Sequence, residues 1–140
     1  MVTTRRRACV MLTIALFAVT VIGCASTGTT TPVAVKDVSS LAGKWTGWIR
    51  STGGGSTPAT IELTPGGDYV TRTEAFNTQG KATIKDGALV LVGTGGSGRL
   101  GVSGRTSTAS ITEGAGGNLV MRGSGRDDIG PFDFEFTKQK

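Results

Sequence analysis

The chain has 140 residues, of which 23 are glycine, and its 15 Lys and Arg residues exceed its 10 Asp and Glu residues, giving a formal net charge of +5. It contains two cysteines and no histidine. Without histidine the chain lacks the most common general base and the most common metal ligand, so the composition argues against the familiar histidine-dependent hydrolases and metalloenzymes.

The N-terminal segment has the organisation of an export signal. Arg5–Arg7 precede an apolar stretch that covers residues 8–22. A permanent transmembrane helix needs about 20 apolar residues, and this stretch is shorter. A basic start followed by a short apolar region therefore favours a cleaved signal peptide over residues 1–23. An uncleaved membrane anchor is the alternative interpretation.

The apolar stretch ends in Val21-Ile22-Gly23-Cys24, which resembles the lipobox of bacterial lipoproteins. In that family the signal peptide is removed before the cysteine, whose thiol receives diacylglycerol and whose new amine often receives an acyl chain such as palmitate. The resemblance implies that Cys24 is the lipidated first residue of the mature protein and anchors it to a membrane of the cell envelope. Ala25, in place of Asp, resembles lipoproteins sorted to the outer membrane, where the domain would face the periplasm.

Removal of the signal peptide changes what the composition implies. Cys9 leaves with the signal and Cys24 is used by the lipid, so the mature domain has no cysteine for a disulfide, a metal site or a nucleophile. Three arginines also leave, so 12 basic residues remain against 10 acidic ones and the net charge falls to +2. We therefore expect no nucleic-acid partner.

Two short segments precede the globular domain. Residues 24–35 are small, polar and rich in threonine, and they predict a flexible tether that holds the domain off the membrane. Residues 37–42 predict a single helical turn, with Asp37 or Ser39 as its N-cap. The globular domain is predicted over residues 36–140.

The rest of the chain is predicted to form short strands separated by glycine-rich turns. Among these turns, Asp86-Gly87 predicts a tight hairpin, because both residues tolerate positive φ. Phe132, Phe134 and Phe136 alternate with Asp133 and Glu135, as expected for a strand with one buried face and one wet face. Some runs could belong to one bent strand, so we predict eight to nine antiparallel strands in a sandwich or barrel. The nine runs are Trp45–Arg50, Thr60–Thr64, Asp68–Glu74, Lys81–Lys85, Ala88–Val92, Arg99–Gly104, Thr106–Thr112, Leu119–Gly123 and Phe132–Thr137.

The first strand opens with Gly43-Lys44-Trp45, which resembles the Gly-x-Trp signature of lipocalins and related calycin-type barrels. In that family the tryptophan closes one end of the barrel and often packs under a basic side chain from the last strands. The resemblance implies an all-β fold, a small up-and-down antiparallel β-barrel of about eight strands, with Arg122 or Lys138 above Trp45. Trp48 has the opposite parity and is expected on the outer face.

Three Ser-Gly-Arg repeats end in Arg99, Arg105 and Arg126. A row of arginines at one rim could bind an anionic head group through forked hydrogen bonds. The simpler interpretation, repeated turn chemistry with solvated arginines, is the one that we favour. If one of them points into the barrel, it is the best candidate for orienting a ligand.

The remaining motifs do not amount to an active site. Residues 96–101 match the pattern Gly-x-Gly-x-x-Gly, but the helix that a dinucleotide site requires does not follow. Asp127 and Asp128 could bind Ca²⁺ but more simply form a turn. Asp133 and Glu135 face away from the phenylalanines and should point to water rather than form a carboxylate pair. We therefore predict a protein that is not an enzyme and that needs no cofactor or metal.

Two classes of function remain, together with a purely structural role in the envelope. The first is a non-enzymatic module that binds a small apolar or amphipathic ligand in the barrel interior. The second is a protein-interaction module, such as a protease or lysozyme inhibitor, that uses the loops Thr52–Thr57 and Thr94–Gly98. The interior of the first class would be lined by Trp45, Ile49, Ile61, Leu63, Leu89, Leu91, Met121, Phe132, Phe134 and Phe136.

Overall fold

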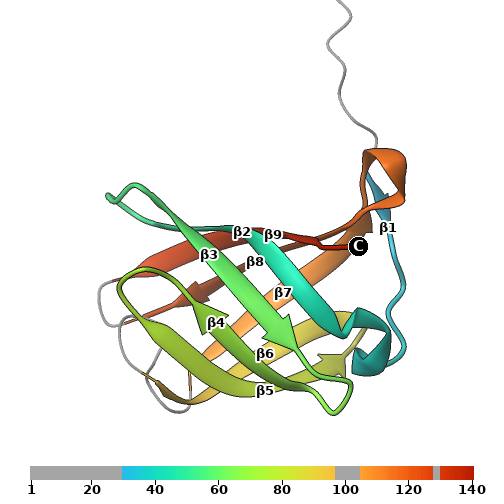
Figure 1. The fold of residues 1–140 in the computed structure, drawn as a ribbon, viewed down its shortest axis with the longest axis horizontal. Helices are drawn as coiled ribbons and strands as arrows, with labels where there is room; N and C mark the ends of the chain where they lie inside the picture. The colour runs from blue at the N-terminus through green and yellow to red at the C-terminus, as the bar shows by residue number, and fades with distance from the viewer. Residues whose placement is uncertain (1–29, 97–104, 128–129) are drawn as a thin grey trace, which may run out of the picture.

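The computed structural model describes residues 30–96, 105–127 and 130–140 (Figure 1). The run predicted over Arg99–Gly104 and the end of the loop predicted over Thr94–Gly98 lie outside the described residues. Within the described ranges, no helix is long and apolar enough to cross a membrane. The elements are β1 Thr31–Pro32, η1 Val38–Leu41, β2 Gly43–Ser51, β3 Ser56–Leu63, β4 Asp68–Arg72, β5 Asn77–Lys85, β6 Ala88–Gly96, β7 Thr106–Glu113, η2 Ala115–Gly117, β8 Leu119–Arg126 and β9 Pro131–Lys138.

Strands β2 to β9 form a closed antiparallel barrel of eight strands. Each strand pairs with its neighbour in the sequence, and β9 returns to pair with β2, where Gly47 lies opposite Phe136. The up-and-down barrel predicted from the sequence is therefore confirmed. Strand β1 pairs with Thr112 and Glu113 of β7, beyond the residues of β7 that β6 contacts.

Local turn chemistry sets several of the strand ends. Asp86 and Gly87 both have positive φ, 52° and 77°, as the predicted two-residue hairpin turn requires. Strand β4 ends at Arg72, two residues before the predicted limit. It ends there because the Thr73 hydroxyl accepts hydrogen bonds from the backbone N–H groups of Ala75 and Phe76, which turns the chain out of the sheet.

One end of the barrel is closed by η1 and the residues around it, and we call it the closed end. Asp37 caps η1 by accepting a hydrogen bond from Ser40 N at 3.1 Å, so Asp37 is the N-cap of the predicted helical turn. Leu41 and Trp45 are 1% and 0% exposed. The Trp45 indole Nε1 donates to the carbonyl oxygen of Leu41 at 2.9 Å, which satisfies the polar atom of this buried ring.

Lys138 is the basic residue above Trp45. Its Nζ lies 6.0 Å from the centroid of the indole ring and donates to the carbonyl oxygen of Ser40 at 3.1 Å. A cation at this distance from an aromatic face is attracted by the ring quadrupole. Of the two candidates from the sequence, Lys138 therefore has this role. Arg122 instead forms an ion pair with Glu135.

Inward-facing glycines of β8 make room for the phenylalanines of β9. Gly123 pairs with Phe134, and Gly125 pairs with Phe132. A Cβ atom at either glycine would overlap the tip of the paired ring, so the rings can lie against the β8 wall only because these positions are glycine. The ring centroids of Phe132 and Phe134 are 6.4 Å apart, and those of Phe134 and Phe136 are 5.9 Å apart. The three rings thus form a continuous column inside the barrel.

The open end of the barrel as the candidate functional site

The end of the barrel opposite η1 is the open end. The chain order places the β2–β3 hairpin, the β4–β5 connection and Asp127 there, whereas the turns at residues 64–67, 86–87 and 114–118 lie at the closed end. Figure 1 shows the two ends, with β1 and the C-terminus at the closed end. Two adjoining hollows occupy the open end.

The inner hollow lies inside the barrel and has a volume of about 40 Å³. Its apolar walls come from Ile49, Ile61, Leu91, Phe132, Phe134 and Phe136. A cavity must offer about 10–15 Å³ to hold one water, whereas pockets for drug-sized ligands have volumes of about 300–1,000 Å³. The inner hollow can therefore hold a few waters or a small group, and the side chains fill most of the interior.

The outer hollow lies between the β2–β3 hairpin, the end of the β4–β5 connection and the start of β9. It has a volume of about 160 Å³ and is lined by Ile49, Ser51, Gly54, Gly55, Thr57, Phe76, Asp127 and Phe132. Ile49 and Phe132 line both hollows, so the two spaces adjoin at these side chains.

The ten residues predicted to line the barrel interior are all buried in its core. Their inward direction follows from the strand alternation, as expected. Six of them line the inner hollow. The other four do not line either hollow and pack toward the closed end or the middle of the barrel: Trp45, Leu63, Leu89 and Met121.

Polar side chains enter the inner hollow from β4, β5 and the start of β7. They are Tyr69, Thr71, Thr78, Arg105 and Ser107. Burial raises the pKa of the Tyr69 phenol to about 12, because the charged phenolate would lose its hydration. The hydroxyl of Thr78 is buried and has no hydrogen-bond partner among the described residues. A mostly apolar hollow with a few converging polar groups is typical of small-molecule sites.

Sequence reasoning missed most of these polar residues. The run around Tyr69 reads as polar alternation, and Thr71 and Thr78 look like ordinary strand threonines. The available signal was parity, because Tyr69 and Thr71 are two apart and share the inward face of β4. Arg105 is the exception, since an arginine of the Ser-Gly-Arg repeats was expected to orient a ligand if it pointed inward.

The three arginine repeats have different positions. Arg105 lines the inner hollow, Arg126 is exposed at the end of β8, and Arg99 lies outside the described residues. Arg105 is the single charged side chain among the described residues that line the inner hollow. A guanidinium is a planar fork of hydrogen-bond donors, a geometry that suits acidic and carbonyl groups.

Asp127 is 8% exposed and forms a turn with Gly130. Its Oδ1 accepts a hydrogen bond from Gly130 N at 2.9 Å, and its own N–H donates to the Gly130 carbonyl oxygen at 2.9 Å. Asp128 lies outside the described residues. Among the described residues, no cluster of three acidic, histidine or cysteine side chains could hold a metal ion.

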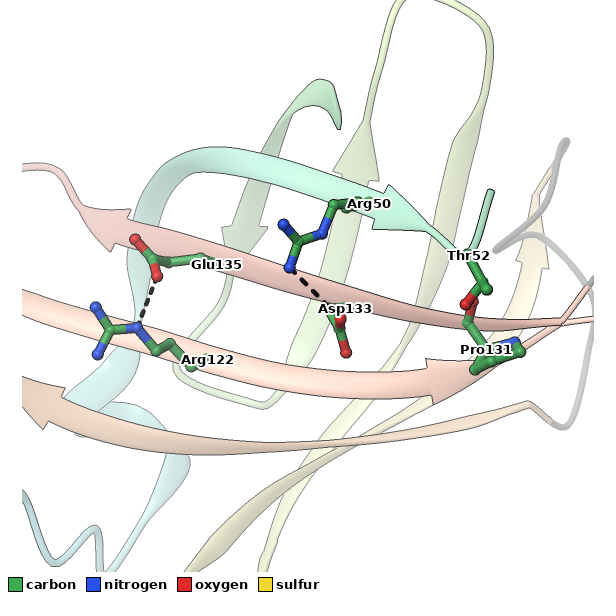
Figure 2. Close-up of polar contacts among 6 residues, drawn as sticks. All are labelled: Arg50, Thr52, Arg122, Pro131, Asp133 and Glu135. Carbon is green, nitrogen blue, oxygen red and sulfur yellow. Dashed lines mark hydrogen bonds and ion pairs between the residues drawn. The ribbon is translucent and has the colours of Figure 1, made fainter. Parts of the chain in front are cut away.

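Asp133 and Glu135 lie on the outer wall and point away from the barrel core (Figure 2). Asp133 Oδ2 lies 3.8 Å from Arg50 Nη2, and Glu135 Oε2 lies 2.6 Å from Arg122 Nε. Such exposed ion pairs contribute little to stability, typically about 0–1 kcal/mol. Near the same wall the Thr52 hydroxyl donates to the Pro131 carbonyl oxygen at 3.1 Å, which joins the β2–β3 hairpin to the start of β9 (Figure 2).

The loop predicted as a contact surface for proteins over Thr52–Thr57 forms the β2–β3 hairpin and is mostly exposed. In the neighbouring strand β3, Pro58 and Ala59 come just before Thr60, which is the first residue of β3 that pairs with β4. Pro58 has no N–H, which discourages a further strand from pairing with this stretch of edge. The hairpin therefore exposes side chains and glycines to its surroundings rather than a free sheet edge.

The fold and the two hollows define a class of protein: a small up-and-down β-barrel with one closed end and one open end that carries a hollow. Comparison of the chain with protein-family models, with curated proteins and with solved structures finds no match in any of the three.

Proposed function

We propose that the chain is a lipid-anchored, non-enzymatic binding module that takes a small apolar or amphipathic ligand at the open end of its barrel. The observation that carries this proposal is the pair of adjoining hollows at that end, which share Ile49 and Phe132. Their apolar walls and few polar groups match the make-up of small-molecule sites. Because the inner hollow is small, we expect the ligand to lie mainly in the outer hollow rather than to be enclosed inside the barrel.

The proposed lipid anchor would orient the open end of the barrel relative to the membrane. β1, the first described element after Cys24, pairs with β7 at the closed end. A lipid on Cys24 would hold the closed end toward the outer membrane and leave the open end facing the periplasm. We therefore expect the ligand to arrive from the periplasm rather than from the bilayer to which the protein is attached.

We also propose that the barrel is lipocalin-like. The supporting residues are Gly43-Lys44-Trp45 at the start of β2 and the contact of Lys138 with the Trp45 ring, which is the arrangement that the family resemblance implies. In this interpretation the closed end is a structural feature and the open end carries the binding function.

A second candidate function is a protein-interaction module that uses the β2–β3 hairpin. The observation in its favour is the small free volume inside the barrel, about 40 Å³, together with the exposure of residues 52–56. An inhibitor of an envelope protease or of lysozyme would act through such a loop and would need no interior space.

Native mass spectrometry of the mature chain, purified from membranes in detergent micelles, distinguishes the two candidates. A small molecule that co-purifies and dissociates on denaturation supports the binding module, and we expect Ile49→Asn in the mouth to abolish it. Trp48→Ala, on the outer wall of the same strand, is the matched control and should retain the molecule. A ligand-free mass that also takes up no apolar dye contradicts the binding module and favours the hairpin.

A further inference from the structure

We propose that the hydroxyls of Tyr69, Thr71 and Thr78 form a polar subsite in the inner hollow, and that this subsite takes the carbonyl oxygen of an uncharged ligand. The inference rests on the proposed binding function and names the chemical group by which the ligand is held. The three side chains line the inner hollow and are 6%, 3% and 2% exposed. Each of them is therefore shielded from bulk solvent by the barrel itself.

The pairing of β4 with β5 brings the three hydroxyls to one wall of the barrel. Thr71 and Thr78 are opposite each other in this antiparallel pair and both are buried, so their Cβ atoms are about 4.5–5.5 Å apart on the inward face. Tyr69 lies two residues before Thr71 and pairs with Gly80, whose missing Cβ leaves room for the phenol ring. The subsite is thus built on two paired strands rather than on a loop.

The wall across the inner hollow is apolar. β9 is four strands away from β5 in either direction around the eight-stranded barrel, so the two strands lie opposite each other. Phe132, Phe134 and Phe136 of β9 line the hollow from that side. A group bound between the two walls meets hydroxyls on one side and aromatic surface on the other, which suits a polar group carried by an apolar chain.

The Thr78 hydroxyl has hydrogen-bonding capacity that the fold does not use. It is buried and has no hydrogen-bond partner among the described residues. Such groups are rare in proteins and costly unless water or a ligand satisfies them. For Tyr69, burial alone raises the pKa of the phenol, and no hydrogen bond or charge from the described part of the chain offsets it. Both hydroxyls keep their hydrogen at physiological pH and can donate it to a ligand.

The subsite favours an uncharged group over an anion. A carboxylate in a buried hollow needs an available cation, because it loses its own hydration. Arg105, the charged residue among the described lining of this hollow, already interacts within the chain. A carbonyl oxygen needs only hydroxyl donors, and its two lone pairs can accept from two of them. We therefore expect a ketone or an ester whose apolar chain extends past Ile49 and Phe132, which line both hollows.

The test compares 2-heptanone with 2-methyl-1-heptene, in which a methylene group replaces the carbonyl oxygen. Backbone amide shifts of the ¹⁵N-labelled mature chain in detergent micelles report the two affinities, and partition into empty micelles is measured for each compound. We expect 2-heptanone to shift the amides of Thr71, Thr78 and Gly80. The quantity compared between variants is the ratio of the two affinities, because the ratio cancels the different uptake of the compounds by detergent.

Three variants locate the subsite. Thr78→Val replaces the hydroxyl by a methyl group and should reduce the affinity for 2-heptanone, relative to the alkene, by at least about fivefold. Thr78→Ser keeps the hydroxyl and should stay within about twofold of the natural chain. Thr112→Val is the matched control, since its hydroxyl is also buried without a partner among the described residues but lines neither hollow. An unchanged ratio in Thr78→Val, or an equal fall in Thr112→Val, overturns the subsite.

Urea unfolding of the same variants checks that the hydroxyl is not required by the fold. Thr78→Val should unfold at a urea midpoint no lower than that of the natural chain, because the hydroxyl that it removes bonds to no described residue. A lower midpoint would show that the fold uses this hydroxyl and would contradict the subsite.

The outcomes separate this inference from the proposed function. If both compounds shift amides at the open end and Thr78→Val leaves their affinity ratio unchanged, the binding module stands and the carbonyl subsite is wrong. If neither compound shifts these amides, the carbonyl subsite is rejected. The binding module is then decided on its own by the co-purifying molecule in native mass spectrometry.

Discussion

Tyr69 is the residue whose chemistry the barrel changes most clearly. It is 6% exposed, and its ring lies over Gly80, where a Cβ would overlap it. Ionisation of a buried phenol places a negative charge in surroundings that hydrate it poorly, which is why its pKa rises to about 12. The phenol is thus neutral at any physiological pH and can serve the inner hollow as a hydrogen-bond donor or acceptor.

Tyr69 is the only tyrosine in the chain, so its ionisation can be followed without interference from others. We expect the tyrosinate absorbance to rise with a midpoint near pH 12 rather than near pH 10, the ordinary pKa of tyrosine. The raised pKa stabilises the folded state below pH 10, and this contribution is lost as the pH rises from 10 through about 12. Urea unfolding at several pH values should show this loss, and Tyr69→Phe should remove it. A midpoint near pH 10 would show that the phenol is hydrated and would contradict its burial.

At the scale of the elements, β8 and β9 are matched to each other by glycine and phenylalanine. The bulky face of β9 meets a strand that has no side chain at the two facing positions. Glycine weakens an isolated strand, but here it allows aromatic rings to fill a narrow barrel. The richness in glycine that the composition shows is therefore, in part, a packing requirement.

Alanine substitutions in β8 should have graded effects on the free energy of unfolding. A Cβ at Gly123 would overlap the Thr108 carbonyl oxygen as well as the Phe134 ring, and a backbone atom cannot easily move. We expect Gly123→Ala to cost about 3 kcal/mol or more. For Gly125→Ala, the three atoms nearest the new Cβ all belong to the side chains of Ser107 and Phe132, so this variant should cost about 1–2 kcal/mol.

The matched control for the two β8 variants is Gly55→Ala in the β2–β3 hairpin, where a Cβ would meet nothing within 4 Å. We expect this variant to remain within about 0.5 kcal/mol of the natural chain in urea unfolding. If Gly123→Ala proved as stable as Gly55→Ala, the close packing of β9 on β8 would be wrong.

At the scale of the whole molecule, the two ends of the barrel have separate roles in our proposal. The closed end holds η1, Trp45 and Lys138 and receives the chain from the N-terminal side. The open end carries both hollows. This separation allows a lipid anchor and a ligand to occupy the same small domain without competing for space.

The anchor itself can be tested by changing each cysteine in the exporting host. Cys24→Ala should leave an uncut precursor that carries no lipid, because the thiol to be acylated is absent. Labelling with radioactive palmitate and the mass of the membrane-bound protein give the answer. Cys9→Ala lies inside the predicted signal and should be processed and lipidated normally. Normal processing and anchoring of Cys24→Ala would show that the lipobox assignment is wrong.

The sequence by itself determined the features that depend on local geometry. The alternation of Phe132, Phe134 and Phe136 with acidic residues predicted the inner and outer faces of β9, because successive side chains of a strand point in opposite directions. The Asp86-Gly87 pair predicted its hairpin from backbone preferences alone. Eight antiparallel strands and the buried position of Trp45 followed from the same local patterns and the family resemblance.

Only the tertiary structure decided how much space the barrel retains and which residues meet across it. The choice of Lys138 over Arg122 beside Trp45 depends on the register of β9 against β2, which no local pattern specifies. The entry of Tyr69, Thr78 and Arg105 into one hollow depends on barrel closure, which brings residues distant in sequence to the same level. The free volume is the small difference between the space that the strands enclose and the volume of the side chains inside it. It can therefore be known only once the positions of all the packed side chains are known.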